Sequence, residues 1–332
     1  MKYLVIDVAA EHGGALSILK QFISKFREDK ENEYTVIVNS LDFENADNIR
    51  FVKIPWVKKS RLHRIYFDSF YVKRLIKEYK PDVLFSLQNK GFKVRNLRQE
   101  IYFHNALFIC EKRFSIKESR KLWIYQNVIS ALTKRTLKYA DKIIVQAEWI
   151  KRGLASKWKI DEGKICVERP NINPIFENST ENAVQHPKAL FYPANFASYK
   201  NHTTLIKACA ELWEENGNDS FSLVLTGTEE KLPMTIKSQI SGKNYPISFV
   251  GALSQEEMKC TYEKTALVFP SYIETVGLPL VEAKGLMRPI IAADCEYAHE
   301  SVGEYEKVLY FHPFDSETLK LHIERTIINI TN

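Results

Sequence analysis

Short apolar segments alternate with longer amphipathic segments along most of this 332-residue chain. In the first part of the chain, the apolar segments predict strands at 2–8, 34–39, 83–86, 101–103 and 142–146. In the second part, they predict strands at 189–192, 221–225, 247–250, 266–269, 289–292 and 308–311. Strands that alternate with helices in this way are typical of α/β folds with doubly wound parallel sheets.

One polar segment without periodicity interrupts this pattern, at residues 177–187. Its composition is typical of a linker, and the chain is longer than the size at which a single core usually stops growing. We therefore predict two Rossmann-like domains, at 1–176 and 188–332, that face each other across a cleft. The last helix is expected to pack back toward the first domain. Ligands of such folds bind at the carboxyl ends of the strands, which would line this cleft.

The composition indicates a protein of the cytoplasm. The five cysteines are scattered without paired spacing, which argues for reduced thiols rather than disulfides or a zinc site. No apolar run approaches the roughly 20 residues that a membrane-spanning helix needs. The apolar run at the N-terminus contains Asp7 and is too short for a signal peptide.

The net charge of +6 is divided unevenly between the two parts of the chain. Residues 1–180 contain 34 Lys and Arg against 21 Asp and Glu, or +13, and residues 181–332 contain 13 against 20, or −7. This asymmetry suggests an anionic ligand or surface on the basic side. Nucleic acid is disfavoured as a partner, because no recognition motif accompanies the basic residues.

The most informative segment is 270–283, with the sequence PSYIETVGLPLVEA. It follows the predicted strand 266–269, and Pro279 suits the first turn of a helix. Amides at the N-terminus of that helix favour anions or sugar hydroxyls. They belong to Thr275, Val276, Gly277 and Leu278. Glu274 and Glu282 could reach one polyhydroxyl ligand from different sides. The simpler alternative is an ordinary strand-to-helix turn with solvated acids.

This segment resembles the signature of retaining GT-B glycosyltransferases of the family 4 and group 1 type, in which two glutamates hold a nucleotide-sugar donor. The resemblance implies that Glu282 binds the ribose, while Glu274 binds the donor sugar and belongs to the catalytic residues. It also implies the GT-B fold, with two Rossmann-like domains. Retention of the anomeric configuration is likewise implied by the resemblance.

Two further segments of the second domain resemble the same family. In 192–202, YPANFASYKNH, Lys200 has the position of the lysine that neutralises the donor diphosphate and acts in catalysis. The arginine that the family often has about five residues earlier is absent, and Asn195 is counted with the donor-binding residues instead. In 249–257, FVGALSQEE, Gly251 and Leu253 belong to the loop whose backbone contacts the nucleobase. A solvated loop lysine is the alternative for Lys200.

The first domain contributes a glycine pair and a histidine. Gly13 and Gly14 follow the first strand and begin a helix, so the backbone can approach a phosphate or sugar closely. His104 ends the strand at 101–103, where the resemblance implies a catalytic histidine beside the transferred sugar. A tight turn and a structural histidine are the respective alternatives. His12 and His202 are weaker candidates.

These residues predict transfer of a sugar from a nucleoside diphosphate to a saccharide or lipid-linked saccharide, in cell-surface polysaccharide or lipopolysaccharide assembly. Lys200 and the helix amides would offset charge on the leaving diphosphate. There is no Asp-x-Asp motif, so we expect no essential metal and no cofactor. Two alternatives are a noncatalytic GT-B-like partner subunit and a GT-B epimerase or phosphorylase.

A basic, aromatic segment at 53–80 suggests where an acceptor on a membrane could be reached. Its aromatic residues include Trp56, Tyr66, Phe67 and Phe70, and its cations include Lys58, Lys59, Arg61 and Arg64. Such a segment can dock on anionic lipid at the inner membrane face. The alternative is a surface helix with solvated charges.

Overall fold

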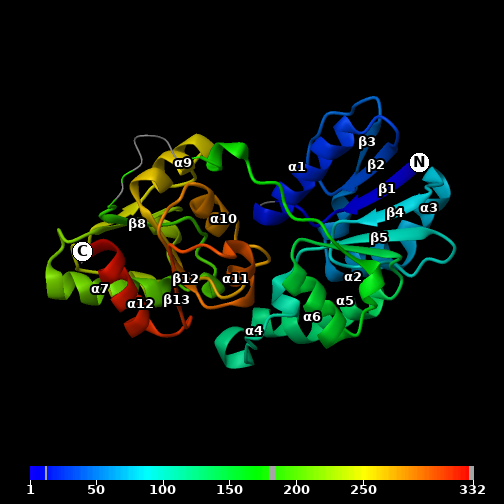
Figure 1. The fold of residues 1–332 in the computed structure, drawn as a ribbon. Coiled ribbons are helices and arrows are strands. Elements are labelled where there is room, and N and C mark those ends of the chain that lie inside the picture. Colours follow the sequence, from blue (N-terminus) through cyan, green and yellow to red (C-terminus); the bar gives the residue numbers. More distant parts are fainter. Residues whose placement is uncertain (12, 179–183, 185, 329–332) are drawn as a thin grey trace. The chain divides into compact units, whose positions relative to one another are not determined.

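The computed structural model of the protein describes residues 1–11, 13–178, 184 and 186–328. His12 and most of the predicted linker lie outside the described residues. The chain divides into two compact units, Met1–Arg169 and Pro170–Asn332, and each has its own parallel sheet (Figure 1).

The first unit contains a seven-stranded sheet in the order β3-β2-β1-β4-β5-β6-β7, in which every pairing is parallel. The strands are β1 (Lys2–Asp7), β2 (Glu33–Val38), β3 (Ile49–Lys53), β4 (Val83–Ser86), β5 (Arg98–Phe103), β6 (Lys142–Val145) and β7 (Ile165–Val167). The apolar pattern does not predict β3 and β7. Both are edge strands and are only partly buried, so they lack the apolar run that marks a central parallel strand.

Helices cover both faces of this sheet. They are α1 (Gly13–Glu28), α2 (Arg61–Tyr66), α3 (Val72–Tyr79), α4 (Ile116–Ile124), α5 (Ser130–Leu137) and α6 (Glu148–Trp158). Phe22 and Phe26 of α1 pack on one face against Val5 and Phe85, while Val72 and Leu75 of α3 pack on the other face. Figure 1 shows α1 and α2 on opposite faces of the sheet. Single π-helical segments, Phe67–Tyr71 and Tyr125–Ile129, connect α2 to α3 and α4 to α5.

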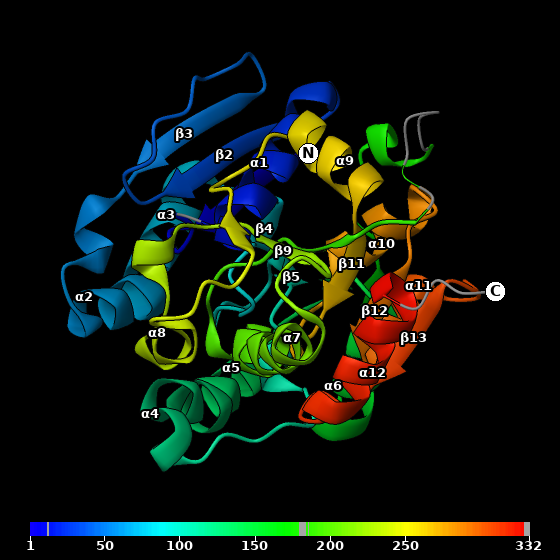
Figure 2. The same cartoon turned by 90° about the vertical axis from the view of Figure 1, so that its left-hand side faces the viewer.

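The second unit contains a six-stranded parallel sheet in the order β10-β9-β8-β11-β12-β13. The strands are β8 (Ala189–Tyr192), β9 (Ser222–Leu225), β10 (Ile247–Phe249), β11 (Ala266–Phe269), β12 (Ile290–Ala293) and β13 (Val308–Phe311). The helices are α7 (His202–Asn216), α8 (Met234–Ile240), α9 (Gln255–Lys264), α10 (Leu278–Gly285), α11 (Glu296–Val302) and α12 (Ser316–Ile323). The apolar pattern predicts each of these strands to within a residue. Figure 2 shows α12 packed beside α7 of the same unit.

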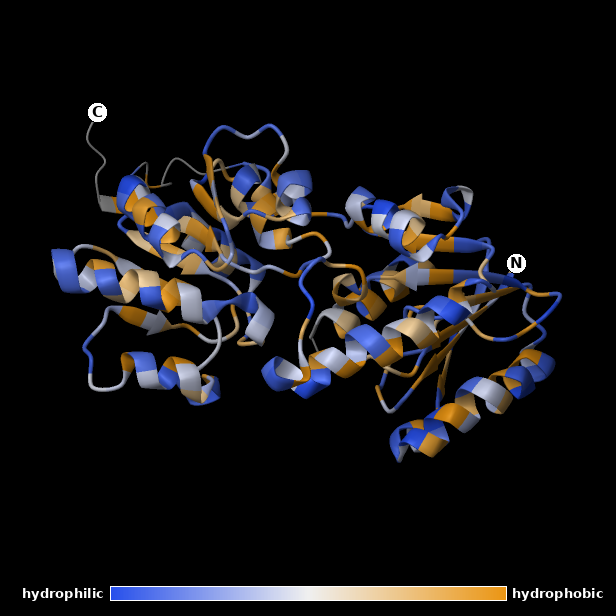
Figure 3. Ribbon diagram, turned by 90° about the horizontal axis from the view of Figure 1, so that it is seen from below, coloured by the Kyte–Doolittle hydropathy of each residue, from blue (hydrophilic) through white to orange (hydrophobic). Residues whose placement is uncertain are grey.

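The central strands are largely hydrophobic because helices cover both faces (Figure 3). All four residues of β11 and of β12 are buried. The strand order changes direction between β1 and β4 in the first unit, and between β8 and β11 in the second. Ligands of doubly wound sheets bind at the carboxyl ends of the strands at such a switch point. Each unit therefore has one defined sheet edge at which a ligand is expected.

Candidate functional site

Lys200 and Glu274 meet at the switch point of the second unit. Lys200 ends the short 3-10 turn Ser198–Lys200 after β8, and Glu274 lies in the loop after β11. The Lys200 ammonium forms an ion pair with Glu274 Oε1, and Ser271 Oγ donates to the same oxygen at 2.7 Å. The side chains of Lys200 and Glu274 are only 14% and 16% exposed. The charged pair is thus held by the protein and still reaches solvent.

The loops around this pair are tied together by Asn201. Its backbone has a left-handed conformation, with φ of 60°, which asparagine tolerates better than most residues. Its amide Nδ2 donates to the carbonyl oxygens of Pro270 and Pro313, at 3.2 and 2.5 Å. Tyr192 Oη donates to the carbonyl oxygen of Lys200 at 2.7 Å. The loops after β8, β11 and β13 are therefore fixed relative to one another within the unit.

Glu282 lies on the first turns of α10, and Tyr262 of α9 holds it. Tyr262 Oη donates to Glu282 Oε2 at 2.8 Å. Burial raises the pKa of the Glu282 carboxyl, and the Tyr262 hydrogen bond opposes that rise. Tyr262 itself is fully buried. A half-buried carboxylate with one fixed donor keeps acceptor capacity for ligand hydroxyls.

Gly277 caps the N-terminus of α10, with φ of 72°, a conformation that only glycine adopts without cost. Its surroundings are also crowded, because a Cβ built there would lie 3.0 Å from the Tyr297 ring and 3.2 Å from Leu280. Pro279 lies in the first turn of α10, as the sequence predicts. Thr275, Val276 and Leu278 therefore lie at the N-terminus of a well-defined helix.

The remaining candidates of the second unit lie on loops. Gly251 has φ of 72° and exchanges two backbone hydrogen bonds of 2.9 Å with Gly227. Leu253 lies partly exposed just before α9. Asn195 is exposed, and its Oδ1 accepts from the amide of Ala197 at 3.0 Å. These hydrogen bonds fix the loop conformations.

In the first unit, the glycine pair begins α1 directly after the loop that follows β1. A Cβ built on Gly14 would meet no atom within 4 Å. Packing within the unit therefore does not require glycine at this position.

His104 follows β5, and Asn89 holds it on two sides. The amide of His104 donates to Asn89 Oδ1 at 2.6 Å, and its ring Nε2 lies 3.3 Å from Asn89 Nδ2. Burial lowers the pKa of His104 to about 4. The imidazole is therefore neutral near pH 7 and can offer a hydrogen bond rather than a positive charge.

Sequence reasoning missed the residues that position the candidates. Asn89, Ser271 and Tyr262 each contact a predicted site residue directly. Asn89 could have been found, because it follows the end of a predicted strand. Tyr262 could not, because only the tertiary structure brings its hydroxyl within reach of Glu282. Within the described ranges, no group of three or more His, Cys, Asp or Glu side chains could hold a metal ion.

The chain matches two family descriptions that follow one another along it. Residues 12–173 match Glycosyltransferase Family 4, and residues 175–329 match Glycosyl transferases group 1. The O-antigen chain mannosyltransferase RfbU of Salmonella typhimurium is 25% identical over 192 residues, which are 56% of this chain and 51% of that protein. The chain thus spans about half the length of this curated relative.

Solved structures share the fold over nearly the whole chain. WaaG, a glycosyltransferase involved in lipopolysaccharide biosynthesis, has a TM-score of 0.70 at 15% identity, over 98% of this chain and 90% of that one. Alr3699/HepE of Anabaena, in complex with UDP and glucose, has a TM-score of 0.68 at 15% identity, over 98% and 89% of the two chains. With two parallel-sheet Rossmann-like units and matches to both family descriptions, this chain belongs to the family 4 and group 1 GT-B glycosyltransferases.

Proposed function

We propose that this protein transfers a sugar from a nucleoside diphosphate to a saccharide or lipid-linked saccharide, with retention of configuration, in lipopolysaccharide or other cell-surface polysaccharide assembly. The Lys200–Glu274 pair at the β8/β11 switch point is the observation that supports this most. Similarity to RfbU and WaaG supports the pathway class. The donor base, donor sugar and acceptor are proposed only as chemical classes.

In this proposal, the C1–O bond to the diphosphate breaks and a bond from the acceptor oxygen to C1 forms. Lys200 stabilises the charge that grows on the departing diphosphate, and a departing phosphate oxygen takes the acceptor proton. Glu274 binds donor-sugar hydroxyls, and Glu282 binds the ribose. Neutral His104 donates a hydrogen bond near the reacting carbon. The reaction then needs no metal and no cofactor.

The free protein already neutralises Lys200 with Glu274. We propose that the donor diphosphate replaces part of that contact, which leaves Glu274 free to accept hydroxyls of the sugar. Gly14 would let the backbone approach the donor, because no neighbouring atom of its own unit requires a glycine there. Gly13, Gly251, Leu253 and Asn195 would complete the donor contacts.

Replacing Lys200 tests the proposal. Donor hydrolysis in the absence of acceptor should fall by about tenfold or more in kcat in Lys200→Ala, because leaving-group charge is greater in the transition state than in the ground state. Binding of the nucleoside monophosphate should change much less. Lys200→Arg keeps the charge and should restore part of the rate, while Lys207→Ala removes a cation of α7 in the same unit and serves as the matched control. Full activity of Lys200→Ala would assign the diphosphate to another cation.

We also propose that residues 53–80 contact an anionic membrane peripherally at the cytoplasmic face. Leu62, Ile65, Tyr66 and Phe70 are 76%, 59%, 53% and 63% exposed. Exposed apolar residues among cations suit the boundary between lipid headgroups and acyl chains. None of the helices in the described part of the chain is long and apolar enough to cross a membrane.

A further inference from the structure

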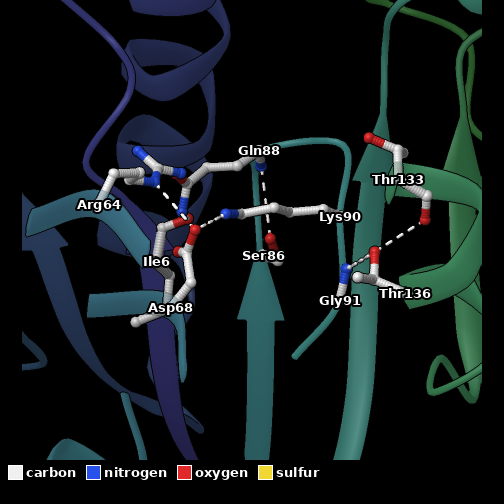
Figure 4. Close-up of polar contacts among 9 residues, drawn as sticks. All are labelled: Ile6, Arg64, Asp68, Ser86, Gln88, Lys90, Gly91, Thr133 and Thr136. Atoms are coloured by element: carbon white, nitrogen blue, oxygen red, sulfur yellow. Dashed lines mark hydrogen bonds and ion pairs between the residues drawn. The ribbon is translucent and has the colours of Figure 1, made fainter. Parts of the chain in front are cut away.

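A polar cluster at the switch point of the first unit was not among the predicted site residues. Arg64 of α2 and Lys90 of the loop after β4 both contact one carboxylate, that of Asp68 (Figure 4). The distance from Arg64 Nε to Asp68 Oδ2 is 3.2 Å, and Lys90 Nζ pairs with the same oxygen. Two cations thus share a single anion.

Gln88 fixes this cluster to the ends of the two strands that flank the switch point. Its Nε2 donates to the carbonyl oxygen of Ile6 in β1 at 3.3 Å, and its Oε1 accepts from Arg64 Nη2. The backbone amide of Gln88 donates to Ser86 Oγ at 3.4 Å, and Ser86 is the last residue of β4. The cluster therefore lies at the β1/β4 edge, where ligands of doubly wound sheets bind.

The local charge balance is positive. Lys58, another cation of the first unit, is paired with Glu11 at 2.8 Å and so is already compensated. Burial raises the pKa of Asp7, the other nearby acid, to about 7, so it carries at most a partial charge near neutral pH. One unit of positive charge is left on Arg64 and Lys90 together, beyond what Asp68 compensates.

The pKa of Lys90 is lowered by these surroundings. Burial and the neighbouring Arg64 charge together lower the pKa of Lys90 to about 8, although Asp68 opposes both effects. A second anion beside the two cations would favour the charged form of Lys90. The side chains of Arg64 and Lys90 are 28% and 20% exposed, so such an anion can reach them from solvent.

We infer that Arg64 and Lys90 form a subsite for a phosphate group of the acceptor, with Asp68 as the internal counter-ion that holds both cations in place when the subsite is empty. Arg64 would supply planar guanidinium donors and Lys90 a point charge, which together suit a phosphate. The inference rests on the proposed function for the existence of an acceptor, but its binding chemistry can be tested separately.

Equilibrium dialysis with inorganic phosphate tests the subsite, with the one of UDP, GDP and ADP that binds most tightly at saturation to occupy the proposed donor site. Phosphate affinity should fall by about tenfold or more in Arg64→Gln/Lys90→Gln, because two charge-assisted contacts are lost. The matched control Arg61→Gln/Lys93→Gln removes two exposed cations from the same helix and the same loop and should bind phosphate as the native protein does. Equal affinity in the two double variants would overturn the inference.

Asp68→Asn provides a test of opposite sign that does not depend on the folding of the double variant. Freed of their internal counter-ion, Arg64 and Lys90 should bind phosphate several-fold more tightly, by about the strength of one partly exposed ion pair. If the cluster only ties α2 to the loop after β4, Asp68→Asn will weaken or leave unchanged the binding of phosphate, and the inference fails. Circular dichroism and UDP affinity check that both units remain folded.

The source of the phosphate is decided by two further ligands. Tighter binding of a short-chain phosphatidate than of inorganic phosphate would place the group on a lipid carrier. Tighter binding of a hexose phosphate would place it on a soluble saccharide. Failure of the native protein to bind any of UDP, GDP and ADP would count against the proposed function and leave the phosphate subsite untouched, because Arg64 and Lys90 lie in the first unit.

Discussion

At the scale of single residues, three candidate side chains are each held by a hydrogen bond to a neighbouring polar side chain. Ser271 holds Glu274, Tyr262 holds Glu282, and Asn89 holds His104. Fixed donors reduce the reorganisation that a site needs when charge develops in it. Hydrogen bonds therefore hold these three side chains in defined positions.

Glu282 provides the sharpest prediction at this scale. Glu282→Gln keeps the shape of the side chain but removes its charge, so nucleoside diphosphate affinity should fall by at least about tenfold, because a hydrogen bond to a charged group is worth about 1.5–3 kcal/mol. The fall should appear in calorimetric titration with UDP, GDP and ADP. Tyr262→Phe, which leaves the carboxylate in place without its fixed donor, should cause a smaller fall. Unchanged affinity in Glu282→Gln would remove Glu282 from the donor site.

At the scale of elements, the loop that begins α10 depends on a glycine for two separate reasons. Gly277 has a left-handed backbone and has Tyr297 and Leu280 within 3.2 Å of a built Cβ. Gly242 has nearly the same φ, 71°, with no atom within 4 Å of its built Cβ. The two positions separate backbone strain from crowding.

We predict that Gly277→Ala lowers the free energy of unfolding more than Gly242→Ala does. The left-handed conformation should cost each variant about 1–2 kcal/mol, and overpacking should add about 1–3 kcal/mol at Gly277 only. Urea unfolding followed by circular dichroism measures both changes. Equal losses in the two variants would show that the rings and side chains around Gly277 yield easily to a methyl group. UDP affinity should also fall in Gly277→Ala if the start of α10 binds the donor.

At the scale of the whole molecule, the net charge has opposite signs in the two parts of the chain. The excess of +13 falls on residues 1–180, which contain the first unit, and the −7 falls on the remainder. The first unit also exposes apolar residues on two helical segments, since Tyr125, Val128 and Leu132 of the segment 116–137 are 40%, 45% and 52% exposed. Basic and apolar groups thus gather on the unit that would bind the acceptor.

Sedimentation with vesicles tests the membrane contact. The native protein should pellet with anionic vesicles at low salt and be released as the salt concentration rises, because the Debye length shortens. Charge reversal should abolish pelleting while donor hydrolysis stays intact. Lys58 and Arg64 are left unchanged in this variant, because both are already paired with carboxylates of the protein. The exposed cations to reverse are Lys59, Arg61, Lys73 and Lys77. Equal pelleting with neutral and anionic lipid would favour a soluble acceptor.

The sequence by itself determined the fold class, the central strands and the start of α10. Central parallel strands are apolar because both faces are covered, and Pro279 after Gly277 marks a helix start, so these features are local and can be predicted. The half-exposed edge strands β3 and β7 carry no such signal. Lys200, Glu274 and His104 were selected by resemblance to a family, and their roles remain predictions.

Tertiary structure alone decided which side chains meet. Lys200 and Glu274 are separated by 74 residues along the chain, yet they pair because β8 and β11 are neighbours in the sheet. Arg64 and Lys90 reach the same carboxylate only because α2 packs near the end of β4. Hydrophobic periodicity reports burial one residue at a time, whereas the pairing of distant polar groups depends on strand order and loop geometry, which no local pattern contains.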